Sequence, residues 1–227
     1  QIGDIVVSYF KRLTKIKNYG LCGSYTADIG CSTGAFIEAT DGFGLDVKGY
    51  ELSEKAISQA PADIRKKIVN ADVNQHIKSS GKKYDLITAY DILEHMQDPR
   101  DFLKNLKEAM QPKGVLAIST PDTDHFLRFV LGPLWPMLQP MQHTVLFSKN
   151  GLRELLLDIG FSDIAIYKGQ KVLTLRYLVN QVAEPSPKLG KFLKLLIAPL
   201  PSWILDKNLV LNISEMFVLC RSGGGEN

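Results

Sequence analysis

The stretch Ala27-Asp28-Ile29-Gly30-Cys31-Ser32-Thr33-Gly34 carries an apolar run directly into a loop bounded by two glycines. Residues 25–29 are typical of a short buried strand, and residues 35–40 are typical of the beginning of a helix. Glycines let the backbone of such a turn adopt positive φ angles and approach a ligand closely. Because the loop also lies at a helix N-terminus, it is a candidate cofactor site.

The spacing Asp28-x-Gly30-x-x-x-Gly34 differs from the Gly-x-Gly-x-x-Gly motif of dinucleotide-binding folds. On its own it indicates either a cofactor loop or a tight strand–helix turn. Glu51 ends the second expected strand, where a carboxylate can accept hydrogen bonds from two ribose hydroxyls, and Asp72 ends the third, where it can meet an adenine amino group. Acids at strand ends are also common surface residues, but three at successive strand ends favour a cofactor.

Strands and helices alternate on both sides of this loop. Further strands are expected at 45–52, 68–73, 84–90 and 115–119, and a helix is expected at 99–110, ended by Pro112-Lys113-Gly114. Residues 4–17 predict an amphipathic N-terminal helix, with Ile5, Tyr9, Leu13 and Ile16 on one face and Lys11, Arg12, Lys15 and Lys17 on the remainder. This alternation is typical of a parallel sheet with helices on both faces.

The alternation stops after Thr120. Closely spaced prolines among bulky apolar side chains interrupt residues 121–147, which we interpret as a lid or a wall of the substrate site. Residues 170–213 form a second apolar, irregular and partly helical insertion. Later regular elements are expected at 150–158, 164–167 and 216–220. We therefore expect one domain over residues 1–222 and a disordered tail at 223–227.

The composition suits one globular domain of 227 residues, with 45% hydrophobic and 22% charged side chains. A net charge of +3 is too small to indicate a nucleic-acid partner by itself. Three widely spaced cysteines form neither a disulfide framework nor a zinc motif. Since no apolar run is long enough to span a bilayer and no signal peptide is visible, a cytoplasmic protein is expected.

The order of these segments resembles class I S-adenosylmethionine (SAM)-dependent methyltransferases, and more narrowly the small-molecule branch that includes the ubiquinone-biosynthesis O-methyltransferases. The matching pieces are Ala27–Gly34, Gly49–Ser53, Ala71-Asp72, Tyr84–Ile87, Asp91–His95 with Asp98-Pro99, Gln111–Gly114, Ser119–Pro121, His143 with Phe147-Ser148, and Gly160-Phe161. Ser32-Thr33 and Lys113 depart from the family, where glycines are usual. The resemblance implies an α/β, Rossmann-like three-layer sandwich with a seven-stranded sheet of order 3-2-1-4-5-7-6 and an antiparallel last strand.

The resemblance also implies a cofactor, SAM, with S-adenosyl-L-homocysteine as its product. It places the loop from Gly30 to Gly34 around the methionine part of SAM. The expected cofactor-binding residues are Asp28, Gly30, Cys31, Ser32, Gly34, Glu51, Leu52, Asp72, Val73 and Tyr90.

Methyl transfer from SAM is an in-line displacement at an already activated carbon, so the protein mainly aligns the nucleophile and excludes water. If the nucleophile is a hydroxyl, a base helps to remove its proton. His143, which follows the expected lid, and His95, which follows the fourth strand, are the candidate catalytic residues. The alternative role for each is to hydrogen-bond the backbone and fix a loop.

A divalent metal is a further alternative. Asp91, Glu94 and His95 are spaced at i, i+3 and i+4, so a helix would place them on one face, where His143 could join them. Some relatives in the resembled family, including small-RNA 2′-O-methyltransferases, use a Glu-x-x-Glu-His pattern in this way. Here the first acid is the shorter Asp91, and Leu-Glu-His also occurs in members with no known metal. We therefore expect no metal.

The segment 188–205 combines a row of lysines with an apolar side. The lysines are Lys188, Lys191 and Lys194, and the apolar residues are Leu189, Phe192, Leu193 and Leu196. Such a basic amphipathic helix predicts either peripheral contact with an anionic membrane or a cap over the substrate pocket, and we favour the cap. In both cases a small apolar or amphiphilic methyl acceptor is expected, methylated at an oxygen.

Two other classes of function stay open. Enzymes that methylate exocyclic amines of nucleic acids commonly carry an Asn/Asp-Pro-Pro-aromatic motif where this chain has Ala89-Tyr90-Asp91-Ile92, and no long basic stripe interleaved with aromatics is present. A non-catalytic binding protein with the same fold is the second, although the complete set of Asp28, Glu51 and Asp72 favours retained cofactor binding. A SAM-using aminopropyl transferase has no motif here.

Overall fold

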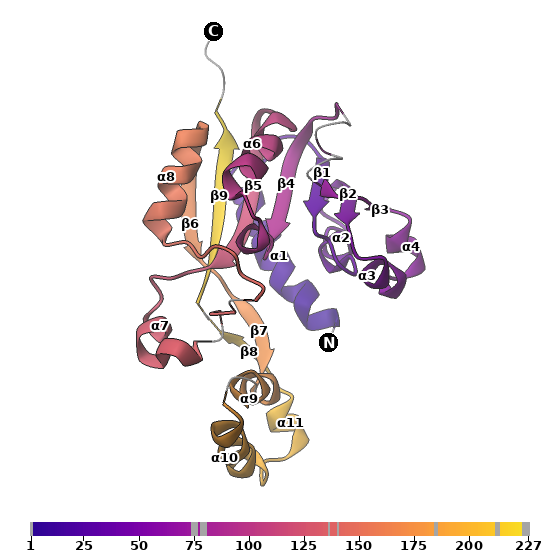
Figure 1. Ribbon diagram of the computed structural model, residues 1–227. Helices are drawn as coiled ribbons and strands as arrows, with labels where there is room; N and C mark the ends of the chain where they lie inside the picture. The colour runs from indigo at the N-terminus through magenta and orange to yellow at the C-terminus, as the bar shows by residue number, and fades with distance from the viewer. Residues whose placement is uncertain are drawn as a thin grey trace.

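A computed structural model describes residues 2–73, 77, 81–135, 137–139, 141–183, 186–211 and 214–223. Figure 1 shows one central sheet between two layers of helices, with a small helical extension projecting from one end. The sheet strands are β1 (Tyr25–Ile29), β2 (Asp46–Glu51), β3 (Ile68–Asn70), β4 (Tyr84–Tyr90), β5 (Met110–Pro121), β6 (Phe161–Lys168) and β9 (Glu215–Ser222).

The strand order is β3-β2-β1-β4-β5-β9-β6, and β9 pairs antiparallel with both β5 and β6. The predicted order and the antiparallel last strand are therefore confirmed. The strands β1, β2 and β4 run parallel, so their carboxyl ends meet at one edge of the sheet, where the glycine loop (residues 30–34) begins.

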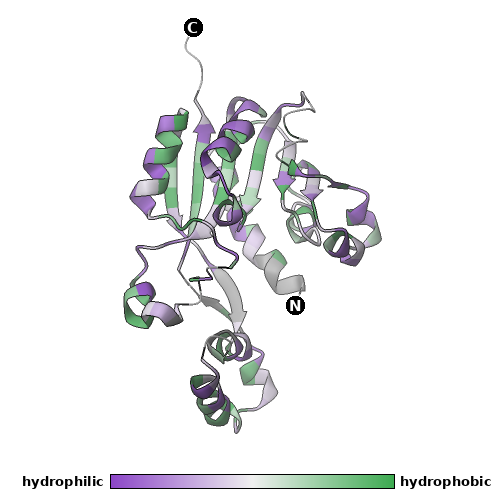
Figure 2. Cartoon of the chain, viewed as in Figure 1, coloured by the Kyte–Doolittle hydropathy of each residue, from purple (hydrophilic) through white to green (hydrophobic). Residues whose placement is uncertain are grey.

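Helices cover both faces of the sheet. Their bounds are α1 (Ile2–Asn18), α2 (Ala35–Ala39), α3 (Glu54–Gln59), α4 (Ala62–Arg65), α6 (Pro99–Glu108), α7 (Phe126–Leu131) and α8 (Lys149–Ile159), with 3-10 turns η1 (Leu93–His95) and η2 (Gly132–Leu134). On one face, Leu103 and Leu106 of α6 pack with Leu156 of α8, and on the other, Leu13 of α1 packs with Phe36 of α2. The apolar strands between them complete the three layers (Figure 2).

Two sequence boundaries are corrected by the structure. The expected helix stop Pro112-Lys113-Gly114 lies inside β5, because α6 ends at Glu108 and the strand begins at Met110. The pairing of β4 with β5 shifts register between Tyr84 and Leu86, so the extra residues are absorbed as a bulge, with Lys113 at a φ of 62°.

Arg12 is also placed differently from the prediction. The helix α1 forms as expected, but Arg12 is 8% exposed instead of lying on the polar face. A buried partner, Glu215 of β9, accepts a hydrogen bond from its guanidinium at 2.5 Å. Pairing of this kind is what makes a buried charge tolerable.

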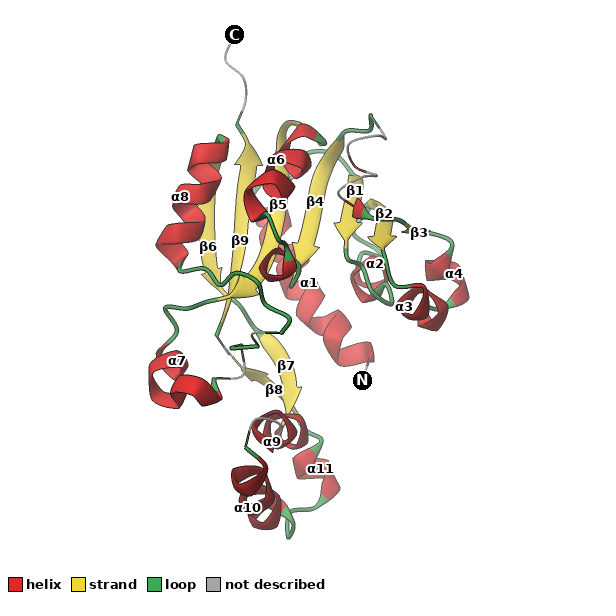
Figure 3. Cartoon of the chain, in the orientation of Figure 1, coloured by secondary structure: helices red, strands yellow, loops and turns green. Residues whose placement is uncertain are grey.

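The insertion at 170–213 is regular, not irregular as expected. A hairpin of β7 (Lys171–Thr174) and β8 (Asn208–Leu211) carries three helices, α9 (Leu175–Ala183), α10 (Pro187–Ile197) and α11 (Ser202–Leu205). Figure 3 shows this extension, residues 171–211, standing away from the sheet. Among the described residues, no helix is long and apolar enough to span a membrane. Of the expected disordered tail, residues 224–227 lie outside the described residues.

Candidate functional site

The glycine loop is held by backbone geometry. Gly30, Ser32 and Gly34 have φ angles of 66°, 50° and 81°. The Gly30 amide donates to the carbonyl of Tyr50 at 2.8 Å. A Cβ on Gly30 would lie 2.2 Å from Cδ1 of Ile92, and one on Gly34 would lie 2.2 Å from a side-chain carbon of Ile64. Both glycines are therefore favoured by conformation, and Gly34 is also favoured by the lack of space beside Ile64.

Glu51 joins this loop to the end of β2. One carboxylate oxygen accepts a hydrogen bond from the Ser32 amide at 2.9 Å, and the other accepts from the Ser53 amide at 2.7 Å. The neighbouring Leu52 is 70% exposed and offers an apolar surface beside the carboxylate. Asp72, which follows β3, is also exposed, and Val73 is half-buried. The structure thus brings Ser32, Glu51 and Leu52 together at adjoining strand ends.

Asp28 occupies the end of β1 and is buried. Its Oδ1 accepts a hydrogen bond from the Thr88 hydroxyl at 2.6 Å, whereas its Oδ2 is buried with no hydrogen-bond partner among the described residues. Burial raises the pKa of Asp28 to about 7, the charge of Glu51 adds to the rise, and the Thr88 hydroxyl opposes it. A buried carboxylate with an unmatched oxygen suits a cationic ligand, and SAM carries both a sulfonium and an ammonium group.

Two expected cofactor residues point their side chains into the core. Cys31 is buried, and its Sγ lies 2.6 Å from where a Cβ on Gly49 would be, so Cys31 can offer only its backbone to a ligand. The Tyr90 ring lies beneath the guanidinium of Arg12 at 4.6 Å and beside Tyr9 at 5.5 Å. The Tyr90 side chain therefore belongs to the interior covered by α1.

Arg12 organises a buried polar network that no sequence pattern indicates. Its Nη1 donates to the Ser119 hydroxyl at 3.1 Å, and that hydroxyl donates to the Asp91 carboxylate at 2.9 Å. Asp91 has a φ of 54°, so β4 ends in a sharp turn there. No α-helix forms over residues 91–95, and the shared helix face expected for Asp91, Glu94 and His95 is therefore wrong.

The two candidate catalytic histidines do meet. The ring centroids of His95 and His143 lie 5.0 Å apart at an interplanar angle of 68°. Nδ1 of His95 is 2.7 Å from the Gln142 carbonyl, and Nδ1 of His143 is 2.7 Å from the Met137 carbonyl. A carbonyl oxygen can only accept, so each Nδ1 carries a proton and each neutral ring presents Nε2 as its basic nitrogen.

Glu94 completes a cluster with these rings. Ligand atoms of Glu94, His95 and His143 all lie within 4.8 Å of one another, and Asp91 is not in the group. Glu94 is 2% exposed, and one of its carboxylate oxygens accepts from the Thr120 hydroxyl at 3.0 Å. Its carbonyl accepts from the Thr144 amide at 2.8 Å, which fastens the loop carrying His143 to η1. One carboxylate and two imidazoles also match the ligand preference of a divalent transition metal.

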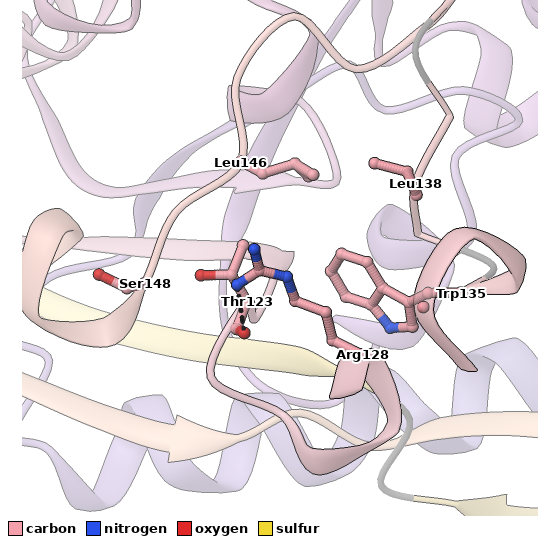
Figure 4. A pocket seen from close by; sticks show the side chains of 7 residues that line it. Thr123, Arg128, Trp135, Leu138, Leu146 and Ser148 are labelled. Carbon is pink, nitrogen blue, oxygen red and sulfur yellow. Dashed lines mark hydrogen bonds between the residues drawn. The ribbon is translucent and has the colours of Figure 1, made fainter. Parts of the chain in front are cut away.

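A pocket of about 510 Å³ lies beside α7. Its lining comprises Thr123, Arg128, Gly132, Trp135, Leu138, Leu146 and Ser148. Figure 4 shows the Arg128 side chain extending between Thr123 and Trp135. The Trp135 indole is fixed by donation from Nε1 to the Ser214 hydroxyl at 2.9 Å. Because Leu138 and Leu146 flank His143 in sequence, one loop contributes both to this wall and to the histidine pair.

A comparison with protein families shows to which family the chain belongs. Residues 22–166, more than half of the chain, match the family model for a methyltransferase domain. The chain belongs to this methyltransferase family. The matched region begins before β1 and ends in β6, so it contains the glycine loop, Glu51 and both histidines. The predicted class I SAM-dependent methyltransferase is confirmed at the level of the family.

Among relatives of known identity, this methyltransferase is similar to the ubiquinone biosynthesis O-methyltransferase of Actinobacillus pleuropneumoniae serotype 7. The two are 29% identical over 113 residues, which is 46% of this chain and 48% of the relative. The chain thus matches about half the length of such curated relatives.

Two solved structures show the fold of the methyltransferase. A SAM-dependent methyltransferase from Archaeoglobus fulgidus has a TM-score of 0.58 at 18% identity, covering 93% of this chain and 92% of that one. Phosphoethanolamine N-methyltransferase 2 of Haemonchus contortus, solved with S-adenosyl-L-methionine, has a TM-score of 0.56 at 18% identity, covering 94% of this chain and 52% of that one. At these identities the likeness concerns the fold alone.

Proposed function

We propose that this methyltransferase transfers the methyl group of SAM to an oxygen of a small apolar or amphiphilic acceptor. The observation that carries the proposal is the buried Asp28, whose Oδ2 has no hydrogen-bond partner among the described residues. Its place beside a positive-φ glycine loop, in a chain of this family, matches the cationic methionine end of SAM. When bound, SAM supplies the activated methyl group.

The chain's own residues supply binding and orientation of the cofactor. Asp28 faces the cationic end, and the amides around Gly30 to Gly34 hold the loop open for it. Glu51 accepts hydrogen bonds from the ribose hydroxyls. Leu52 contacts the adenine ring, and Asp72 accepts a hydrogen bond from the adenine amino group. Cys31 and Val73 contact the cofactor through their backbone atoms. The buried Tyr90 side chain packs beneath the site, in the interior covered by α1.

His143 is the proposed general base, with His95 beside it. The bond from Nδ1 of His143 to the Met137 carbonyl fixes the tautomer that leaves Nε2 basic. In that state Nε2 takes the proton from an acceptor hydroxyl as the oxygen forms its bond to the methyl carbon. The edge-on contact of His95 limits rotation of the ring.

The lining of the pocket beside α7 supports an apolar or amphiphilic acceptor. Trp135, Leu138 and Leu146 offer apolar surface, while Arg128 and two hydroxyl side chains offer polar contacts. Such a lining suits a molecule with an aromatic or aliphatic body and a polar or acidic group. The Actinobacillus relative is an O-methyltransferase of ubiquinone biosynthesis, which agrees with a hydroxyl as the methylated group.

Calorimetry with SAM, followed by transfer of labelled methyl from SAM into a panel of phenolic, lipid and amine acceptors, tests the proposal. We expect SAM binding and labelling of hydroxyl compounds. Absence of SAM binding would instead favour a non-catalytic binding protein. Labelling confined to amines would refute oxygen as the target.

A divalent metal is the alternative use of the cluster of Glu94, His95 and His143. Its specific support is the convergence of three ligand atoms within 4.8 Å. Exhaustive chelation discriminates between the two uses. Full activity after chelation supports the general base, whereas loss of activity that added Mg²⁺, Mn²⁺ or Zn²⁺ restores supports the metal.

A further inference from the structure

Most of the large apolar side chains that are exposed lie in two inserted segments. In the described part of the chain, those outside the two segments are Phe10, Leu52 and Leu157. Those in residues 126–141 are Phe126, Phe129, Val130, Leu138 and Met141, and those in residues 177–203 are Tyr177, Leu189, Phe192, Leu195, Leu196 and Trp203. Figure 1 shows α7 and the extension at the same end of the molecule, the end toward which β1 and β4 run.

The extension is a folded unit with a defined inner face. Gly190 of α10 lies so close to α9 that a Cβ there would meet Ala183 at 2.2 Å. The Arg176 guanidinium of α9 donates two hydrogen bonds to Asp206, at 2.7 and 3.0 Å, and so anchors the end of α11. Val179 and Leu205 are buried. The outer face of α10 is therefore a fixed surface.

The outer face of α10 is apolar, contrary to the cap expected from the sequence. The buried or half-buried residues Gly190, Leu193 and Ile197 mark the inner face. Phe192 and Leu195 lie on the opposite side, where they are 56% and 72% exposed. On the nearby α11, Trp203 is 71% exposed. The apolar side of α10 thus points mainly to solvent, not into a substrate pocket.

The charge of the same segment is entirely positive. Residues 185–205 contain Lys188, Lys191 and Lys194 and no acidic residue. The segment therefore has a local charge of +3, in a chain with 27 basic and 24 acidic residues. All three lysines are exposed. At helical spacing they lie along one side of the exposed apolar residues, where they can meet head groups while the apolar residues enter an anionic bilayer.

We propose that the outer face of α10, with Trp203 of α11, binds the surface of an anionic lipid bilayer. A second copy of the chain fits this face poorly, because a two-fold contact would set the lysines of α10 against those of its mate. A bilayer takes Phe192, Leu195 and Trp203 into the boundary between head groups and acyl chains, while the lysines meet anionic head groups. The carboxyl ends of β1 and β4, with the glycine loop, then lie at the membrane-proximal end of the protein.

Sedimentation of the full chain with lipid vesicles tests this proposal. We expect binding to vesicles of equal parts phosphatidylglycerol and phosphatidylcholine at low salt, weaker binding at about 0.5 M salt because charge is screened, and little binding to pure phosphatidylcholine. Since each lysine at an anionic surface changes the partition coefficient about fivefold, Lys191→Glu with Lys194→Glu should lower it at least about 25-fold.

The matched control is Lys66→Glu with Lys67→Glu, which makes the same charge change on two exposed lysines after α4, and it should bind like the unaltered chain. Trp203 gives an independent readout, because the other tryptophan, Trp135, is 2% exposed. Tryptophan emission should shift to the blue on vesicle addition, and Trp203→Phe should abolish the shift.

Three results would overturn the proposal. They are no sedimentation at low salt, equal binding to neutral and anionic vesicles, and equal weakening by the two lysine pairs. A dimer in analytical ultracentrifugation that Phe192→Ser dissociates would assign the face to a second copy instead. None of these measurements needs an acceptor or SAM, so the outcome is independent of the proposed methyl transfer.

Discussion

Two regions of this methyltransferase are built in opposite ways. In the cofactor region, residues 25–73, ligand-facing groups sit at strand ends and are fixed by backbone bonds such as that from Gly30 to Tyr50. In the proposed acceptor region, residues 121–147, and in the extension, the groups are side chains on inserted segments, and many of them are apolar and exposed. The difference is that backbone hydrogen bonds fix the first region, whereas the second offers exposed apolar surface to a ligand or partner.

The comparison predicts that changes in the acceptor region abolish catalysis without affecting cofactor binding. His143→Asn removes the proposed base but keeps an amide N–H near the place of Nδ1 for the Met137 carbonyl, so the rate should fall about 100- to 10,000-fold. SAM affinity from calorimetry should stay within about threefold of the unaltered chain. His125→Asn is the control, because His125 caps α7 through the Leu127 amide. A similar loss of activity in both variants would remove the special role of His143.

The reverse outcome is predicted for the cofactor region. Glu51→Ala should weaken SAM binding at least about 100-fold, because two hydrogen bonds to a charged group contribute roughly 1.5–3 kcal/mol each. Glu54→Ala, three residues later in the first turn of α3, should change affinity little. Thermal melts of both variants show whether the loop survives, since Glu51 also accepts from the Ser32 amide. Unchanged affinity in Glu51→Ala would contradict the assignment of this residue.

Gly34 and Gly42 allow the cost of a positive φ angle to be measured separately from the cost of steric overlap. Gly34 and Gly42 have φ angles of 81° and 80°, but only at Gly34 would an added Cβ have neighbours within 4 Å. Gly42→Ala should therefore cost about 1 kcal/mol of unfolding free energy for the left-handed conformation alone. Gly34→Ala should cost about 2–4 kcal/mol, because it also overpacks against Ile64. Denaturant melts measure the free energy of unfolding of both variants. Equal losses would mean that the Ile64 side chain moves aside without an energetic cost.

The last prediction is a pH dependence, which is small over any one pH unit. Burial holds the pKa of Asp28 near 7, above its value in an unfolded chain. At a pH below the pKa of the unfolded chain, the Asp28 carboxyl is protonated in both the folded and the unfolded state. Between that pKa and pH 7, it is protonated only in the folded state. Asp28 therefore makes the ligand-free protein less stable as pH rises toward 7, by at most about 1.4 kcal/mol per pH unit. The stability profile of Asp28→Asn should lack this slope.

A cationic ligand favours the ionised form of Asp28, so SAM binding should release protons at about pH 6.5 and almost none at about pH 8.5. Calorimetry in two buffers of different ionisation enthalpy measures the release. Affinity should fall by up to about tenfold per pH unit below 7. Proton release that persists in Asp28→Asn would assign it to another group.

The sequence predicts the strands and the glycine turn of residues 25–73 well because their signals are local. The strand–glycine–helix order of residues 25–40 is a local pattern, and β1 and α2 form on either side of the glycine loop as it predicts. The resemblance added the strand order, which no local signal contains. Contacts between residues that are distant in the sequence were not predicted. Arg12 has the spacing of a surface residue on an amphipathic helix, and only the structure places Glu215, 203 positions later, beside it.

The extension and the histidine pair show the same limit. Helical spacing correctly predicts two faces for α10, but which face turns inward depends on the close approach of Gly190 to Ala183 on another helix. Asp91 failed as a metal candidate because the backbone turns sharply at the end of β4 and delivers its carboxylate to Ser119. The pairing of His95 with His143 likewise required the loop that Glu94 fastens through Thr144.

The position of β9 governs how the protein is made. This strand separates β5 from β6 in the sheet, yet it follows both in the chain. While a ribosome is still synthesising residues 122–214, β5 has an open edge and β6 has no neighbour to pair with. Exposed strand edges of that kind invite pairing between chains. We therefore expect the chain to be most prone to aggregation before β9 is complete, and Arg12 acquires its counter-charge, Glu215, only with that strand.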